Sequence, residues 1–284
     1  MAESQSLSSL AHVVRQHDRD RFLTALFAPE ARRGELLALY AFNYEIAKTR
    51  EVVSEPVLGQ IRLQWWRETV ESIYGGGPVH PHETVAPLAE AIRSRGLSRA
   101  HVDALIAARD LDLGGEAPES LAALEAYAES SSARLVWLAL EVLGERGANA
   151  IAAGRAVGIA YALSGLLRAL PFHARAKRLY LPRDLCAAAG LRIDQEVFEL
   201  RPSPALARVV AQVATAAAGH LAAARAQQGA VPRAALPALL PAVLAGADLA
   251  RLKRAGYDPF DRRLARQDPW RGWRLTLAAL RRRY

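Results

Sequence analysis

Apolar residues recur every three or four positions through most of the chain, and Gly, Pro and Asp interrupt the pattern. This spacing places apolar side chains on one face of a helix, whereas a half-buried strand would alternate apolar and polar positions. The chain is rich in Ala, Leu and Arg and poor in β-branched and aromatic residues, a composition that favours helices. The sequence therefore predicts an all-α protein.

Prolines, glycines and acidic residues set the limits of the predicted helices. The segment 147–170 is almost entirely apolar and rich in small residues, so we expect it at the centre of a helical bundle, where Pro171 would end it. No linker is long enough to separate two domains, so residues 1–284 should form one domain. The predicted ranges are 30–53, 56–74, 83–94, 99–112, 121–144, 147–170, a short helix from about 182, 204–228, 232–255 broken at two prolines, and 270–284.

The N-terminus and the cysteine content indicate a cytoplasmic protein. Acidic residues come early and no apolar run precedes a small-residue cleavage site, so the first 22 residues do not resemble a signal peptide. The single cysteine, Cys186, excludes an internal disulfide and is expected in the core. The longest uncharged run, 209–224, is mostly alanine and too short to span a bilayer. We expect a soluble protein in which residues 1–20 are candidates for a flexible segment.

The positive charge is concentrated at the C-terminus. Residues 251–284 contain eleven Lys and Arg against three Asp, which accounts for the whole net charge of +8. A basic segment of this kind fits an anionic membrane surface, with Arg281, Arg282 and Arg283 as the candidate contacts, or an acidic partner. The alternative is a solvated helix face. Nucleic acid is not expected, because no known reader motif accompanies the arginines.

Three segments together resemble the squalene/phytoene synthase superfamily. They are "LFAPEARRGELLALYAF", "LQWWRETVESIYGG" and "AVGIAYALSGLLRALPFHARAKRLYLPRDL", in the family's order from about Phe22 to Leu191. The resemblance implies a single-domain helical bundle of the isoprenoid synthase type, with a central cavity. Members of the family join two prenyl diphosphates head to head. Two aspartate-rich helices face each other there and bind magnesium ions that bridge to the diphosphate leaving group.

The aspartate-rich motifs that the resemblance implies are degenerate in this chain. The first acidic pair should fall at Ala47 and Glu51, and the second at Ala169 and His173. Magnesium prefers oxygen ligands, so alanine and imidazole serve it poorly. We therefore expect no catalytic residues, no metal and no cofactor. Magnesium is expected only under the alternative that the chain is an enzyme. In that case another acid, such as Glu45, would replace the missing aspartates as a metal ligand.

Basic residues near the degenerate motifs are candidates for an anion site, because guanidinium groups bind phosphate in bidentate fashion. The alternative is a set of internal ion pairs with Glu45 and Glu51. The resemblance also implies aromatic residues that line the cavity, although Trp65 and Trp66 point about 100° apart, so at most one faces it. The anion or diphosphate candidates are Lys48, Arg50, Arg168, Arg178 and Arg183, and the cavity candidates are Tyr40, Phe42, Tyr44, Trp65, Trp66 and Tyr161.

One branch of the superfamily shows the same departures. "QWWRETVESIY", "EAYAESSSARLVWLALEVLG" and the terminal "RRRY" resemble complex I assembly factor 6 and its bacterial relatives. This implies a non-catalytic protein that helps to assemble respiratory complex I, peripheral on the cytoplasmic membrane face, with complex I subunits or assembly intermediates as partners. Two alternatives stay open. One is an isoprenoid transferase or synthase with an atypical metal site, and the other is a non-catalytic binder of an isoprenoid or lipid.

Overall fold

A computed structural model describes residues 2–53, 55–266 and 268–284, with side-chain surroundings from residue 9 onward. Helices account for all regular structure in this part of the chain, which confirms the all-α prediction. The elements are α1 (Ala2–His17), α2 (Arg19–Ala25), α3 (Glu30–Ala47), α4 (Thr49–Val52), α5 (Pro56–Tyr74), α6 (Val85–Arg95), α7 (Arg99–Gly114), α8 (Leu121–Ala128), the π-helix η1 (Glu129–Ala133), α9 (Arg134–Val142), α10 (Ala148–Arg175), α11 (Arg183–Ala188), the π-helix η2 (Ile193–Val197), α12 (Pro204–Ala226), the 3-10 helix η3 (Arg233–Ala235), α13 (Leu236–Leu239), α14 (Pro241–Arg254), α15 (Arg262–Ala265) and α16 (Arg271–Leu280).

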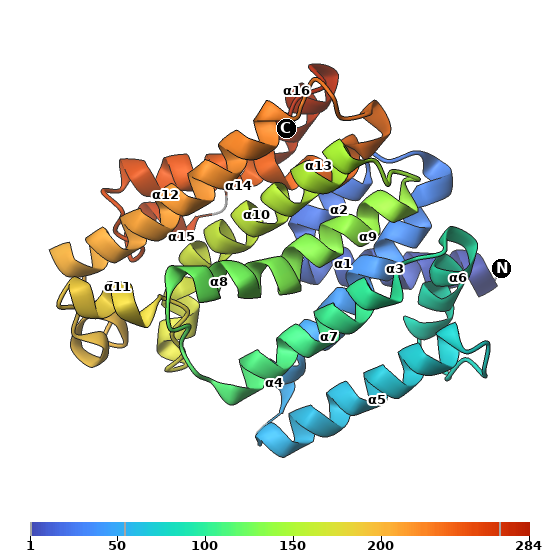
Figure 1. Ribbon diagram of the computed structural model, residues 1–284, viewed down its shortest axis with the longest axis horizontal. Coiled ribbons are helices and arrows are strands. Elements are labelled where there is room, and N and C mark those ends of the chain that lie inside the picture. The colour runs from blue at the N-terminus through green and yellow to red at the C-terminus, as the bar shows by residue number, and fades with distance from the viewer. Residues whose placement is uncertain (1, 54, 267) are drawn as a thin grey trace.

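The long helix α10 lies at the centre of the bundle, as its small apolar residues predicted. It packs against α12 and α14 on one side and against η1 and α9 on the other (Figure 1). Gly158 explains the close approach to η1, because a β-carbon there would lie 2.7 Å from the backbone nitrogen of Ala133. Small side chains at such points let two helix backbones come together.

The N-terminal helices build the other part of the bundle around α3. This helix packs against α1, α6 and α9, and its side chains Leu36, Leu39 and Phe42 are fully buried. Helix α1 covers α3 and buries Leu10 and Val14. Whether residues 1–20 are flexible stays a prediction, and Met1 lies outside the described residues.

Several helix boundaries differ from the predicted ones, and three of the differences change how a helix is divided or ended. The predicted helix 30–53 is divided at Lys48, which has a ψ of −10° and lies between α3 and α4. Pro171 lies inside α10 instead of ending it, because Leu170 and Ala174 continue the buried face and outweigh the missing proline N–H. The predicted helix 121–144 contains the π-helical segment η1 between α8 and α9. A π-bulge inserts one residue and leaves no clear sequence signal.

Among the described residues, two helices, α10 and α12, are long and apolar enough to cross a membrane by length and composition alone, and η3–α13 with α14 forms a bent pair that passes the same test. This corrects the expectation that the run 209–224, which lies within α12, is too short to span a bilayer. In the fold, α10 and α12 pack extensively against each other, and 61% of the most apolar stretch of α10 is buried. Their apolar character is thus used, at least in part, for helix packing.

Candidate functional site

The four degenerate motif positions lie on α3, α4 and α10. Ala47 ends α3 and Glu51 is exposed on α4, whereas Ala169 and His173 are half-buried on α10. The two motif regions meet at Arg178, whose Nη2 donates a hydrogen bond to the backbone oxygen of Arg50 at 3.3 Å. The four positions therefore supply a single carboxylate, which is exposed.

The nearest compensating acid, Glu45, is already engaged. Lys48 Nζ donates to one of its carboxylate oxygens at 2.6 Å and Arg62 Nη2 to the other at 2.7 Å. Across residues 2–53, 55–266 and 268–284, no three or more His, Cys, Asp or Glu side chains are grouped so that they could hold a metal ion. The residues at this site do not fit the magnesium ions of the family, because too few free oxygen donors converge. The expectation of no cofactor stays a prediction.

A buried polar network next to α10 was not predicted from the sequence. Asp112 Oδ1 accepts hydrogen bonds from the hydroxyls of Tyr127 at 2.7 Å and Tyr180 at 2.9 Å, and Arg109 approaches Oδ2 at 3.3 Å. Burial raises the pKa of both tyrosines, so both remain protonated donors. Arg109 also donates to the side-chain oxygen of Asn43 at 3.3 Å. The network fastens α3, α7 and α8 to the loop after α10. Tyr127 and Tyr180 lie in segments that carry the family resemblance, the one signal that could have indicated them.

His173 is kept neutral by its surroundings. Its ring lies 4.7 Å from that of Tyr180, and its Nδ1 is buried without a hydrogen-bond partner. Burial lowers the pKa of His173 to about 4, and the nearby Arg178 contributes in the same direction. A neutral imidazole here cannot replace the negative charge of the family's aspartate.

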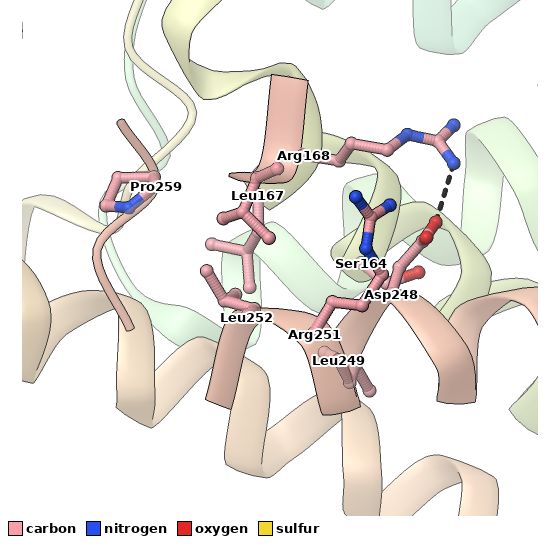
Figure 2. A pocket seen from close by; sticks show the side chains of 9 residues that line it. Ser164, Leu167, Arg168, Asp248, Leu249, Arg251, Leu252 and Pro259 are labelled. Carbon is pink, nitrogen blue, oxygen red and sulfur yellow. Dashed lines mark hydrogen bonds and ion pairs between the residues drawn. The ribbon is translucent and has the colours of Figure 1, made fainter. Parts of the chain in front are cut away.

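Arg168 and Lys48 make separate ion pairs. Lys48 pairs with Glu45, as the alternative of internal ion pairs predicted. Arg168 instead reaches Asp248 at 2.6 Å and Asp20 at 3.3 Å, and Figure 2 shows its guanidinium turned toward Asp248.

Arg271 contacts both Asp20 and Asp248, each at 2.9 Å, so two arginines and two carboxylates form a balanced cluster. The resemblance to the family gave no indication of this cluster. Asp20, Asp248 and Arg271 lie outside the three segments that carry the resemblance. In this structure the charge of Arg168 is neutralised by protein carboxylates.

The other anion candidates differ in their partners. Arg183 pairs with exposed Glu119 at 3.2 Å. Arg50 and Arg178 are half-buried, their Nε atoms are buried without hydrogen bonds, and neither pairs with a carboxylate within the described part of the chain. These two arginines, which lie side by side, are the members of the predicted set that retain unneutralised charge.

Three of the six aromatic candidates lie in the packed core, and the other three are half-buried. Tyr40, Phe42 and Trp66 are buried, and Trp66 meets Phe42 edge-on at 5.2 Å, whereas Trp65 is half-buried. The two tryptophans thus differ in burial, as expected for neighbours that point about 100° apart on a helix. Tyr44 stacks on His17 at 4.2 Å.

Tyr161, the remaining aromatic candidate, donates its hydroxyl to Asp20 at 3.3 Å. Two enclosed spaces beside α10 are small, about 20 Å³ at Arg168 and Asp248 (Figure 2) and about 10 Å³ at His173 and Arg178. Each suits about one water molecule, far below the several hundred Å³ of a typical ligand pocket.

The fold and the motif positions indicate the class of protein to which the chain belongs. The profile of the squalene/phytoene synthase family matches residues 14–274, and the chain belongs to that family. Its fold is similar to that of a crystallised dehydrosqualene synthase, with a TM-score of 0.86 at 15% identity, over 99% of this chain and 97% of that one.

Among curated proteins, the chain is similar to NADH dehydrogenase (ubiquinone) complex I, assembly factor 6, of Bos taurus. The two are 33% identical over 274 residues, and this match covers 96% of this chain and 81% of the bovine protein. It is also 29% identical over 199 residues to presqualene diphosphate synthase of Rhodopseudomonas palustris, which covers 69% of each protein. The similarity to the assembly factor thus extends further along the chain than the similarity to this enzyme.

Proposed function

We propose that the protein is a non-catalytic member of the squalene/phytoene synthase family that acts in the assembly of respiratory complex I. The observation that carries the proposal is the donor set at the motif positions, where Ala47, Ala169 and His173 provide no carboxylate and Glu51 stands alone and exposed. The similarity to complex I assembly factor 6 over 96% of the chain supports the role. Its partners would be complex I subunits or assembly intermediates, at the cytoplasmic face of the membrane.

A gene deletion tests the assembly role. In a strain that lacks the gene, assembled NADH dehydrogenase should fall sharply on native gels stained for NADH oxidation, and the wild-type gene should restore it. Unchanged levels of the assembled enzyme in the deletion strain would contradict the proposal.

The Glu51→Ala variant separates the non-catalytic role from a metal-dependent enzyme. Glu51 is the one acid left at the motif positions and is exposed, so its removal should leave the fold intact. The variant should restore complex I as well as the wild-type gene does. If instead the purified wild-type protein releases diphosphate from farnesyl diphosphate with magnesium, and Glu51→Ala does not, the isoprenoid synthase alternative holds.

A further inference from the structure

An arginine-lined groove runs along the C-terminal helix α16. It lies between α12, α14 and α16 and has a volume of about 530 Å³. Arg225, Arg274, Arg281 and Arg283 line it together with apolar residues that include Leu221 and Val243. On the other side of α16, Arg282 lines a second groove of about 690 Å³. The three terminal arginines therefore flank the helix on both sides.

The acidic residues of the same segment neutralise Arg274 but not the three terminal arginines. Asp268 accepts from Arg274 Nε at 3.1 Å, and Asp261 is bound by Arg263. Asp258 accepts from the backbone N–H of Phe260 at 2.9 Å. Within the described part of the chain, Arg281, Arg282 and Arg283 pair with no carboxylate. The groove region therefore keeps an excess of positive charge.

The last residue fixes the position of the terminal arginines. The Tyr284 side chain is buried, and its hydroxyl donates to the backbone oxygen of Ala224 on α12 at 3.2 Å. The arginine run is thereby held against α12 rather than extending into solvent. Its three charges lie at defined positions beside the two grooves.

The outer face of α16 is apolar and exposed. Leu275 is fully buried and attaches the helix to the bundle, and Trp273 and Leu280 lie on the opposite side with 64% and 76% of their surface exposed. Trp270, at the start of the helix, is 62% exposed. Large apolar side chains that are this exposed and this close together are typical of an interaction surface.

We propose that α16 and its two grooves form a docking surface for a bilayer that contains anionic phospholipid. Trp270, Trp273 and Leu280 would enter the interfacial layer, and Arg281–Arg283 would contact lipid phosphates. A bilayer presents negative charge with apolar material directly beneath it, and tryptophan is favoured at that boundary. An acidic protein or a nucleic acid would match the arginines, but neither requires exposed tryptophan and leucine side chains beside them.

Vesicle binding by the purified full-length protein tests the surface. Vesicles of phosphatidylcholine with and without phosphatidylglycerol are sedimented with the wild-type chain, with Arg281→Ala/Arg282→Ala/Arg283→Ala, and with Trp270→Ala/Trp273→Ala. The matched control is Arg93→Ala/Arg175→Ala/Arg208→Ala, which removes the same charge from exposed positions elsewhere. Urea denaturation of each variant checks that the fold is retained.

The wild-type chain and the control should bind vesicles that contain phosphatidylglycerol, and both should bind pure phosphatidylcholine weakly. The terminal arginine variant should bind on the order of 100-fold more weakly, because each arginine contributes several-fold near an anionic surface. The tryptophan variant should also bind weakly, and the blue shift of tryptophan fluorescence seen with the wild-type chain should be largely lost. Equal losses in the control, or strong vesicle binding by the tryptophan variant, would overturn the proposal.

No vesicle binding by a wild-type chain that still binds polyglutamate would point to an acidic protein instead, and would also overturn it. Vesicle binding is measured on the purified protein, whereas the assembly role is measured in cells. Either proposal can therefore fail without the other.

Discussion

Two arginine-rich regions of this protein have opposite surroundings. At the centre, Arg168 and Arg271 share Asp20 and Asp248, so four charges cancel within the bundle. Around α16, Arg281, Arg282 and Arg283 face two grooves without acidic partners in the described part of the chain. The difference shows that an arginine beside a degenerate catalytic motif need not bind an anion. Charge that protein carboxylates neutralise holds helices together, and charge left unneutralised is available to a ligand.

The central cluster, which consists of Asp20, Arg168, Asp248 and Arg271, should respond most strongly to mutation. Asp248→Ala leaves Arg168 and Arg271 with one shared carboxylate, and Arg271 is only 11% exposed. Removing one partner of a buried ion pair leaves an uncompensated charge, so the free energy of unfolding in urea should fall by about 3 kcal/mol. The control is Asp110→Ala, which breaks the exposed pair with Arg67 and should change stability by less than about 1 kcal/mol. Equal effects of the two substitutions would mean that the central cluster is not a structural element.

The contact between α10 and η1 is the next most sensitive point. Gly158→Ala would place a β-carbon 2.7 Å from the Ala133 nitrogen, so we expect a loss of roughly 2 kcal/mol in the free energy of unfolding. Gly165→Ala, in the same helix, meets no atom within 4 Å and should stabilise the protein by roughly 0.5 to 1 kcal/mol. Thermal and urea unfolding measure both. Equal signs for the two substitutions would contradict the packing described here.

The neutral His173 should give the smallest effect, a dependence of stability on pH. Its pKa of about 4 in the fold lies below the usual value of about 6.5, so the unfolded chain binds a proton first as the pH falls. Stability should therefore be lost between about pH 6.5 and pH 4, by roughly 1 to 2 kcal/mol because the partly exposed ring is screened by solvent, and His173→Gln should reduce that loss. The comparison is made by urea unfolding at several pH values. The same slope for the wild-type chain and the variant would exclude His173 as its cause.

The sequence alone determined the helical class, the central place of α10 and the excess of charge near the C-terminus. These follow from local quantities, because apolar periodicity, small residues and charge counts need no knowledge of which helices meet. The family resemblance located the motif positions, and the chain's own letters showed that Ala47, Ala169 and His173 are not carboxylates.

The tertiary structure decided the partners. Asp20, Asp248 and Arg271 come together from distant parts of the chain, and so do Asp112, Tyr127 and Tyr180, so no local pattern could indicate either cluster. Pro171 stayed within its helix because the buried face of α10 continues beyond it. The grooves beside α16 exist only because Leu275 and Tyr284 attach that helix to its neighbours, which leaves the terminal arginines and the exposed tryptophans on one surface.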